Sequence, residues 1–200
     1  MYVMKLLVPA DTEAVDKLID ARTHFQVANC HHPRGEGLGL RDTVTGAGCP
    51  KTPDKQTGGD GRRAIGMWED GELLAAFVLQ HAAPHHGWTL EERDEPTLQV
   101  SHAYALPGQP LLGRLAALWL SDYAARQTDQ PWIRCAVREQ ALAWRLVRRC
   151  GWRHVRDVND IHGTLHLMQR APERARRLEA VVSSAGVPAL RPAPDPRLPG

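Results

Sequence analysis

Apolar residues recur at two spacings along this chain, and segments with one spacing alternate with segments with the other. Short apolar or alternating runs are typical of strands, whereas repeats at three and four residues indicate helices. The chain begins with a predicted strand over residues 5–8, which Pro9 ends. A helix is then expected from Asp11, its N-cap, to about Phe25, because apolar residues recur at helical spacing: Ala14, Val15, Leu18, Ile19 and Ala21.

Two apolar runs at residues 64–68 and 73–79 are separated by a short polar turn, which predicts a β-hairpin. Asp70 and Gly71 favour the positive φ angles that such a turn requires. A further strand is expected over residues 98–106, and Pro107 with Gly108 ends it.

The same alternation continues from residue 110 to residue 168. Pro110 suits the first turn of a helix that runs to about Gln127. The apolar stripe of this helix consists of Leu111, Leu112, Leu115, Leu118, Trp119 and Tyr123. A strand is expected over residues 132–137, a helix over 141–149 with Gly151 as its C-terminal cap, and a last pair of strands between residues 155 and 168.

Two other parts of the chain lack this periodicity. Residues 26–63 hold eight of the seventeen glycines, and we expect a flexible insertion that contributes little to the core. Residues 170–200 begin with a charged segment, expected to be helical from Pro172 to about Val182, and end in a proline-rich tail that we expect to be disordered. The predicted organisation is one domain over residues 1–169 and a C-terminal extension over residues 170–200.

Composition agrees with a globular domain. The chain has 200 residues of which 42% are hydrophobic, enough to bury a full core. Its longest apolar runs span only a few residues, and its N-terminus lacks the features of a leader peptide. We therefore expect a soluble cytoplasmic protein that does not enter a membrane.

The formal net charge of +2 is unevenly distributed. Residues 170–200 carry six Arg against Glu173, Glu179 and Asp195, so this extension is +3 and the rest of the chain is −1. Nucleic-acid binding needs basic residues clustered with groove-reading or stacking partners, which this pattern does not provide. No nucleic-acid partner is expected.

The four cysteines do not form a spaced disulfide framework, and we expect reduced thiols at Cys30, Cys49, Cys135 and Cys150. The first two, together with His31 and His32, offer four side chains able to bind zinc. Adjacent histidines and a long gap between the cysteines do not match the usual paired spacings. The sequence therefore predicts no metal site.

The order of the predicted elements resembles that of the GNAT N-acyltransferase superfamily, over residues 2–169 apart from 26–63. Three strings strengthen the resemblance: WEDGEL at the hairpin (68–73), WTLEE before the next strand (88–92) and GWRHV after the last core helix (151–155). The resemblance implies an α/β fold, specifically an α+β mixed sheet of about six or seven strands flanked by helices.

In that superfamily two neighbouring strands splay apart and hold the pantetheine arm of acetyl-CoA, or another acyl-CoA, as an added strand would be held. The resemblance places this splay between residues 98–105 and 132–137. The following loop and helix N-terminus direct N–H groups at the pyrophosphate. The residues so assigned to acetyl-CoA as co-substrate are Ala105, Leu106, Gly108, Gln109, Leu111, Leu112, Gly113 and Arg114.

Two positions depart from the superfamily's pattern. Its loop reads Gln or Arg, two residues, Gly, one residue, then Gly or Ala, and here Leu111 stands at the first glycine when Gly113 is the last. In the last core helix, Val147 takes the place of a Tyr that protonates the departing thiolate, and Gln140 takes the place of an Asn. Valine cannot donate a proton, whereas glutamine can still hydrogen-bond.

Acyl transfer to an amine needs a base, a polarised thioester carbonyl and a proton for the leaving thiolate. His102 lies mid-strand, where the superfamily commonly presents a base, and imidazole can take a proton near neutral pH. Tyr104 shares that face of the strand and is a candidate replacement acid. The alternatives are a structural histidine and a packing role for the tyrosine. With Gln140, these two residues are the catalytic candidates.

A polar segment over residues 81–96 combines histidines and acids: His81, His85, His86, Glu91, Glu92, Asp94 and Glu95. An acidic rim would attract a cationic amine, although a solvated acidic loop explains the same residues. Trp88 within this segment is expected to form a substrate-facing wall or to anchor a lid.

These residues predict an enzyme, an N-acetyltransferase that moves an acetyl group from acetyl-CoA to an amine of a small molecule or a protein. One alternative is a binding or regulatory module that kept the scaffold after losing the phosphate loop and the Tyr acid, or a changed reaction on that scaffold. Another is partner binding through residues 26–63 or the C-terminal tail. The sequence leaves the oligomeric state open, a homodimer included.

Overall fold

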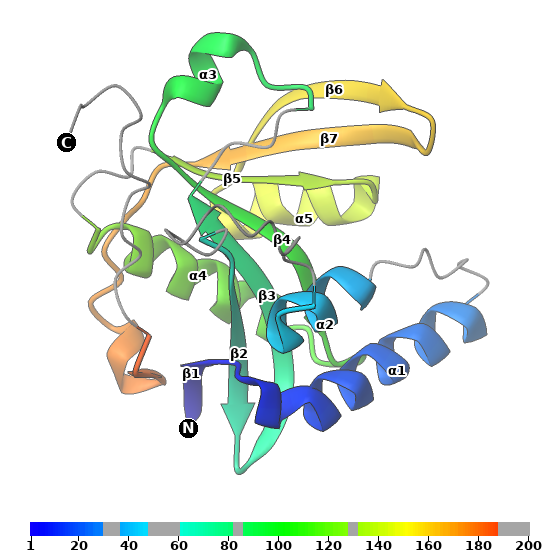
Figure 1. The fold of residues 1–200 in the computed structure, drawn as a ribbon. Coiled ribbons are helices and arrows are strands. Elements are labelled where there is room, and N and C mark those ends of the chain that lie inside the picture. The colour runs from blue at the N-terminus through cyan, green and yellow to red at the C-terminus, as the bar shows by residue number, and fades with distance from the viewer. Residues whose placement is uncertain (30–36, 48–60, 82–85, 128–131, 188–200) are drawn as a thin grey trace, which may run out of the picture.

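A single mixed β-sheet runs through the computed structural model, which describes residues 1–29, 37–47, 61–81, 86–127 and 132–187 (Figure 1). In these residues the sheet has eight strands in the order β6-β7-β5-β4-β3-β2-β1-β8. The pairs β4–β5 and β1–β8 are parallel and the others are antiparallel. The strands are β1 (Tyr2–Leu6), β2 (Arg63–Glu69), β3 (Glu72–His81), β4 (Thr97–Ala105), β5 (Trp132–Val137), β6 (Arg153–Asp160), β7 (Gly163–Arg170) and β8 (Val182–Ala185).

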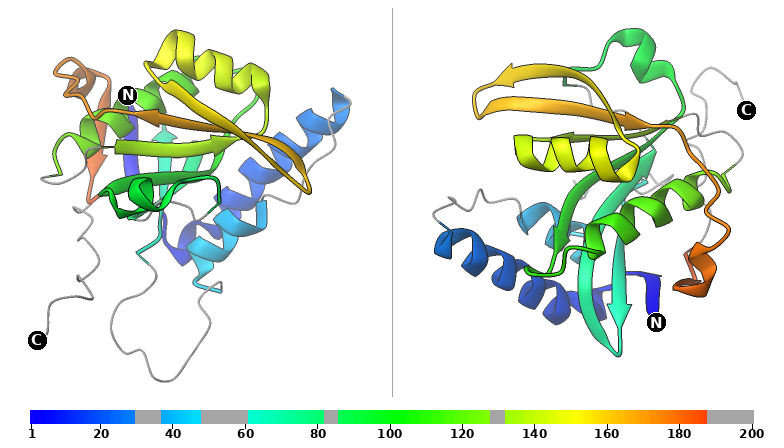
Figure 2. Two further views of the ribbon diagram at one scale, coloured as in Figure 1. Left: turned by 90° about the horizontal axis from the view of Figure 1, so that it is seen from above. Right: turned by 180° about the vertical axis from the view of Figure 1, so that it is seen from behind.

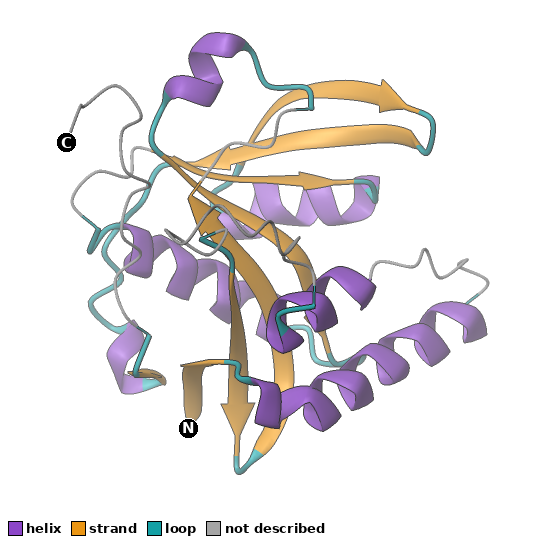
Figure 3. Cartoon of the chain, in the orientation of Figure 1, coloured by secondary structure: helices purple, strands orange, loops and turns teal. Residues whose placement is uncertain are grey.

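Helices cover both faces of this sheet (Figures 1 and 3). The helices are α1 (Thr12–Ala28), α2 (Gly37–Thr45), α3 (Leu90–Asp94), α4 (Leu112–Ala124) and α5 (Gln140–Cys150), with short 3-10 turns η1 (Pro9–Asp11) and η2 (Leu178–Ala180). Figure 2 shows α4 and α5 on the face opposite α1 and α2. The predicted mixed sheet flanked by helices is therefore confirmed.

The helices on each face of the sheet pack against it in a separate hydrophobic cluster. The larger one joins α4 and α5 to the sheet through residues such as Leu112, Trp119 and Ala143. The smaller one joins α1 and α2 to β2 and β3, and it includes Leu40 and Val44 of α2. The expectation that residues 26–63 contribute little to the core is thus wrong for α2, because these two side chains are fully or almost fully buried. Residues 30–36 and 48–60 of that segment lie outside the described residues.

The C-terminal extension also differs from its prediction. Instead of a helix from Pro172 to Val182, the chain has only the turn η2 and then β8, which pairs in parallel with β1. Buried Asp122 of α4 explains the difference, since it accepts hydrogen bonds from Arg174 Nε at 3.0 Å and from the Ala175 N–H at 2.9 Å. These contacts hold the segment against α4 and override its helical propensity. Residues 188–200 lie outside the described residues.

Buried Arg134 of β5 fixes the segment that precedes β4. This side chain is 1% exposed, and its guanidinium donates to the Glu92 carbonyl, the Thr97 hydroxyl and the Glu95 carboxylate. It also lies 4.5 Å from the centre of the Trp88 ring. A buried cation is costly unless it is paired and hydrogen-bonded, and these contacts supply both.

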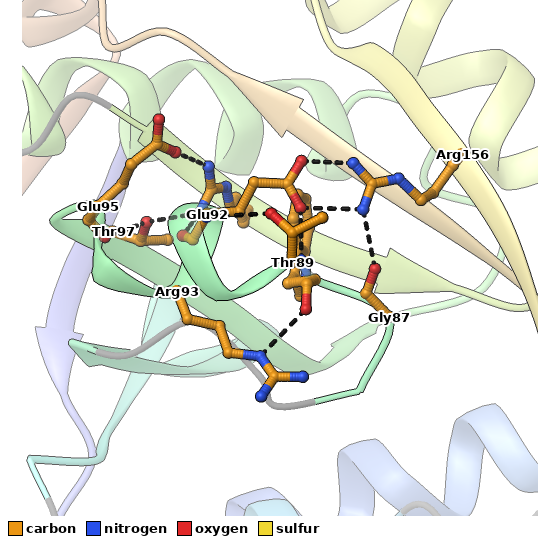
Figure 4. A network of polar contacts seen from close by, with 9 residues as sticks. Gly87, Thr89, Glu92, Arg93, Glu95, Thr97 and Arg156 are labelled. Atoms are coloured by element: carbon orange, nitrogen blue, oxygen red, sulfur yellow. Dashed lines mark hydrogen bonds and ion pairs between the residues drawn. The ribbon is translucent and has the colours of Figure 1, made fainter.

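Glu92 extends this network to β6 (Figure 4). Its carboxylate accepts the N–H of Thr89 at 2.8 Å, while its own N–H donates to the Thr89 hydroxyl, a capping box that begins α3. The same carboxylate pairs with Arg156 at 2.5 and 2.9 Å. Although burial opposes ionisation, the hydrogen bonds from Arg156 and Thr89 hold the pKa of the Glu92 carboxyl below its usual value. Residues 87–97 therefore form a strut between β5 and β6.

This strut predicts unequal effects of removing two acids from α3 and its C-cap. Glu95→Ala leaves the Arg134 cation buried without its carboxylate, and we expect the free energy of unfolding to fall by about 3 kcal/mol, the low end for a broken buried pair because Glu95 is itself 43% exposed. Exposed Glu91 is the matched control, and Glu91→Ala should cost about 0.5 kcal/mol or less. Urea denaturation of both variants measures the difference, and equal losses would contradict the role given to Arg134.

Candidate functional site

The parallel strands β4 and β5 pair along only part of their length. Their register runs from Thr97 opposite Trp132 to Val100 opposite Cys135. Beyond that point β4 continues beside β3 to Ala105, and β5 continues beside β7 to Val137. Figure 1 shows the two strands diverging there. Within the described residues, the facing edges of 101–105 and 136–137 therefore have no strand partner, as the predicted splay requires.

A β-bulge bends β4 at the start of this splay. Ser101 lies opposite Val78 and Tyr104 opposite Ala76, so two residues of β4, His102 and Ala103, face the single Phe77 of β3. His102 has a φ of 47°, in the left-handed region that a residue with a side chain seldom adopts. Such a conformation costs free energy and is often found at functional sites.

The bulge decides which face of the sheet carries the two candidate catalytic side chains. In a regular strand Ser101 and Tyr104 would point to opposite faces, but the extra residue puts both on the side of α1 and α2. Tyr104 packs against the cluster that contains α1 and α2. The His102 ring lies on Gly39 of α2, where an added Cβ would come 2.5 Å from Nε2. His102 and Tyr104 thus lie on the same side of the sheet, as expected, and the sequence pattern does not predict the bulge between Ser101 and Tyr104.

The candidate anion site follows β4 directly. Gly108 adopts a φ of 75°, and α4 begins at Leu112 after an N-cap, Leu111, whose side chain makes no capping hydrogen bond. The first turn of α4 has no acidic residue and contains exposed Arg114. A Cβ at Gly113 would meet nothing within 4 Å, so the backbone there is open to a ligand. A helix N-terminus of this kind favours an anion through its unpaired N–H groups and its dipole.

One residue assigned to the cofactor is placed elsewhere. Leu112 is 1% exposed and belongs to the hydrophobic core, and its N–H donates to the Gln109 carbonyl at 3.3 Å. Neither group is free to contact a cofactor, so that assignment is wrong. Leu111 is 62% exposed, and its side chain stands in solvent beside the helix start.

Cys135 lies where the two strands part, but it cannot serve as a nucleophile. Its side chain is buried, and burial raises the pKa of the Cys135 thiol to about 12. Among the described residues Cys135 and Cys150 are free thiols, as expected. Cys30, His31, His32 and Cys49 lie outside the described residues.

Gln140 and Val147 lie on α5, away from His102. Gln140 begins the helix, is exposed, and lines a cavity of about 440 Å³ at the tip of the β6–β7 hairpin. The other lining residues are Arg138, Asp157, His162, Gly163, Thr164 and His166. Val147 is 37% exposed, and no proton donor stands at its position. The structure thus brings His102 and Tyr104 to one strand and leaves Gln140 at a separate hollow.

Of the four acidic residues before β4, only two remain available to a substrate. Glu92 and Glu95 are committed to Arg156 and Arg134, which leaves Glu91 and Asp94 exposed on α3. Trp88 is 2% exposed beneath this segment, so of the two predicted roles the structure supports an anchor. His85 lies outside the described residues.

Sequence reasoning missed a cluster of His154, Asp157 and His166 on β6 and β7. One oxygen of Asp157, Oδ1, lies 2.6 Å from His154 Nε2 and 2.7 Å from His166 Nδ1. The only signal in the sequence was two histidines and an acid on neighbouring predicted strands. Their register was needed to bring them together, and it cannot be derived from the sequence pattern alone.

None of the described helices is both long enough and apolar enough to span a membrane. No protein-family model matches the sequence. No curated protein matches it either.

The structure is similar to solved acetyltransferases. The aminoglycoside acetyltransferase AAC(6')-Ib with coenzyme A and kanamycin has a TM-score of 0.60 at 15% identity, over 90% of this chain and 98% of that one. A GNAT-family acetyltransferase from Streptococcus agalactiae has a TM-score of 0.57 at 16% identity, over 86% and 96%. An aminoglycoside N(6')-acetyltransferase from Legionella pneumophila has a TM-score of 0.56 at 10% identity, over 90% and 95%. At these identities the likeness concerns the fold.

The contact between His102 and α2 predicts opposite effects of one substitution at two helix starts. Alanine favours a helix over glycine by about 1 kcal/mol, but a Cβ on Gly39 would collide with the His102 ring, which would have to leave its place on α2 and lose its contacts there. We expect Gly39→Ala to lower the melting temperature. Gly113→Ala in α4 meets open space and should raise it or leave it unchanged. Calorimetry measures the melting temperatures of both variants, and a raised melting temperature for Gly39→Ala would contradict the contact between His102 and Gly39.

Proposed function

We propose that this chain, which has the fold of the GNAT acetyltransferases, transfers an acyl group from an acyl-coenzyme A to an amine. The parting of β4 and β5 after Val100 and Cys135 is the observation that carries the proposal. Among the described residues both facing edges lack a strand partner beyond this point, and an amide-containing chain such as pantetheine can pair with a strand edge.

The start of α4 would hold the pyrophosphate of the same cofactor. This helix follows β4 after six residues, so the anion site and the open strand edge belong to one continuous surface of the chain. Gly113 leaves the backbone accessible, and Arg114 adds a positive charge beside the helix dipole. Acetyl-CoA is the co-substrate we favour, since AAC(6')-Ib, which is similar in structure, was solved with coenzyme A and with acetyl-CoA.

The acyl step then uses the two side chains on the bulged part of β4. The amine nitrogen attacks the thioester carbonyl carbon, the carbon–sulfur bond breaks, and the departing thiolate takes up a proton. In this proposal His102 accepts the proton that the amine loses, and Tyr104 supplies the proton that the thiolate needs. Both side chains lie on the side of the sheet that α1 and α2 cover.

The acceptor we propose is a cationic amine of a small molecule. AAC(6')-Ib structures hold kanamycin, ribostamycin and paromomycin, which are amine-bearing sugars. In this chain Glu91 and Asp94 remain exposed to attract a cation, while α2 contributes a wall beside His102. A protein amine as acceptor is the second possibility that this open surface supports.

A second candidate function is a binding module on the same scaffold. Val147 on α5 offers no proton, and Leu111 replaces a glycine in the phosphate loop. Such a module would keep the strand opening and bind acyl-CoA without transferring its acyl group.

The cofactor site predicts that a negative charge at the start of α4 weakens acetyl-CoA binding. Gly113→Asp places a carboxylate where the pyrophosphate would lie, and we expect the dissociation constant to rise by about tenfold or more. An acid at a helix N-terminus stabilises the helix, so the variant should remain folded. Calorimetric titration with acetyl-CoA measures the effect.

Gly113→Ala is the matched control, because it changes the same position without adding charge. The proposal requires binding by the wild type and by Gly113→Ala, and weaker binding by Gly113→Asp. Equal affinities for all three proteins, or no heat with any of them at millimolar acetyl-CoA, would refute the cofactor site.

The roles proposed for His102 and Tyr104 predict that substitution of either residue lowers turnover. His102→Ala should lower kcat/KM by about 10² to 10⁴, the usual contribution of a general base, and Tyr104→Phe should lower kcat with less effect on KM. Release of free thiol from acetyl-CoA with a panel of aminoglycosides and simple amines measures both. His86→Ala, an exposed histidine outside β4, is the control. Acetyl-CoA binding without turnover on any amine would favour the binding module instead.

A further inference from the structure

The β6–β7 hairpin carries a bulge of its own, and this bulge gathers three polar side chains. His154 lies opposite Met168 and Arg156 opposite Leu167, so Val155 is an extra residue in β6. In a regular strand His154 and Asp157, three residues apart, would point to opposite faces. The extra residue brings them to the same face, where Asp157 also lies directly opposite His166 of β7.

The side chains converge to within the reach of a single ion. Their ligand atoms all lie within 4.8 Å of one another. Asp157 Oδ1 accepts from His154 Nε2 at 2.6 Å and from His166 Nδ1 at 2.7 Å. One carboxylate oxygen of Asp157 therefore lies between the two imidazole rings. The three groups are thus two imidazoles and one anion.

Burial and charge around the cluster favour a cation. The His166 side chain is 10% exposed, whereas His154 and Asp157 are 42% and 53% exposed and can adjust. Arg138 lines the neighbouring cavity, but Asp160 neutralises it with two contacts of 2.5 and 2.9 Å. The charge of Arg138 therefore does not oppose a cation at Asp157.

We propose that His154, Asp157 and His166 bind a divalent transition-metal ion of the zinc class. Two imidazoles and a carboxylate suit Zn²⁺, and three protein ligands leave a fourth position open. Asp157 and His166 also line the cavity of about 440 Å³, so there is space for a water or a small anion beside the three side chains. Ligand atoms around zinc are roughly 3.3 Å apart, which needs only small rotations of the two exposed side chains.

The first test is Zn²⁺ binding by competition with a chromogenic chelator near neutral pH. The full chain with Cys30→Ser and Cys49→Ser is used throughout, so that thiols elsewhere do not contribute. We expect one ion per chain, and Asp157→Asn should weaken binding by at least about 100-fold, because loss of an outer-shell partner alone costs about 10- to 100-fold. Asp157→Asn keeps a hydrogen-bond acceptor between the two histidines, and its melting temperature without metal checks the fold.

His166→Gln is the second variant, and His86→Ala, an exposed histidine outside the cluster, is the control that should bind as the parent protein does. Co²⁺ in place of Zn²⁺ gives a second readout, since a visible absorption band of the intensity expected for four-coordinate cobalt should appear in the parent and vanish in Asp157→Asn. Unchanged Zn²⁺ affinity in both cluster variants, or no Zn²⁺ bound by the parent, would overturn the proposal and leave the cluster as a hydrogen-bonded triad only.

Discussion

The partial pairing of β4 and β5 is the constraint around which the rest of the structure is arranged. Two parallel strands normally pair along their whole shared length, and here they stop after Val100 and Cys135. At one end Arg134 holds β5 to the strut before β4 through Glu92, Glu95 and Thr97. At the other end the bulge at His102 turns β4 away. Because one end is clamped and the other bent, the strands can only diverge.

The buried guanidinium of Arg134 also explains why acidic residues precede β4. A buried guanidinium needs acceptors on several sides, and the segment from Trp88 to Thr97 supplies them. Glu92 caps α3 and pairs with Arg156 at the same time, so its negative charge is neutralised by a residue of this protein. An acidic stretch that reads in sequence as a substrate rim is therefore largely a structural strut, and only its outward acids remain for electrostatic attraction.

Local patterns predicted the fold well, whereas nonlocal contacts decided what those patterns missed. The hairpin at Asp70 and Gly71 and the cap at Gly151, with φ of 49°, 84° and 68°, follow from the residues themselves. The strand β8 does not, because Asp122 captures Ala175 across 53 residues and redirects a segment with helical propensity. At the candidate site, the place of His102 and Tyr104 in β4 could be predicted, but buried Leu112 could not be distinguished from its exposed neighbour Leu111 until the orientation of the helix was known.

Both groups of chemically capable side chains stand at bulges, and this bears on how the departures from the superfamily should be understood. The bulge in β6 shifts side-chain alternation by one residue and puts His154 and Asp157 on one face, whereas the bulge in β4 contains His102 with its left-handed φ. The φ of His102 costs free energy, and residues held in such conformations cluster at functional sites. Under the proposed function, acyl transfer by side chains of β4 would account for the strained φ of His102, while Val147 and Leu111 occupy the positions where the superfamily keeps its Tyr and its first glycine.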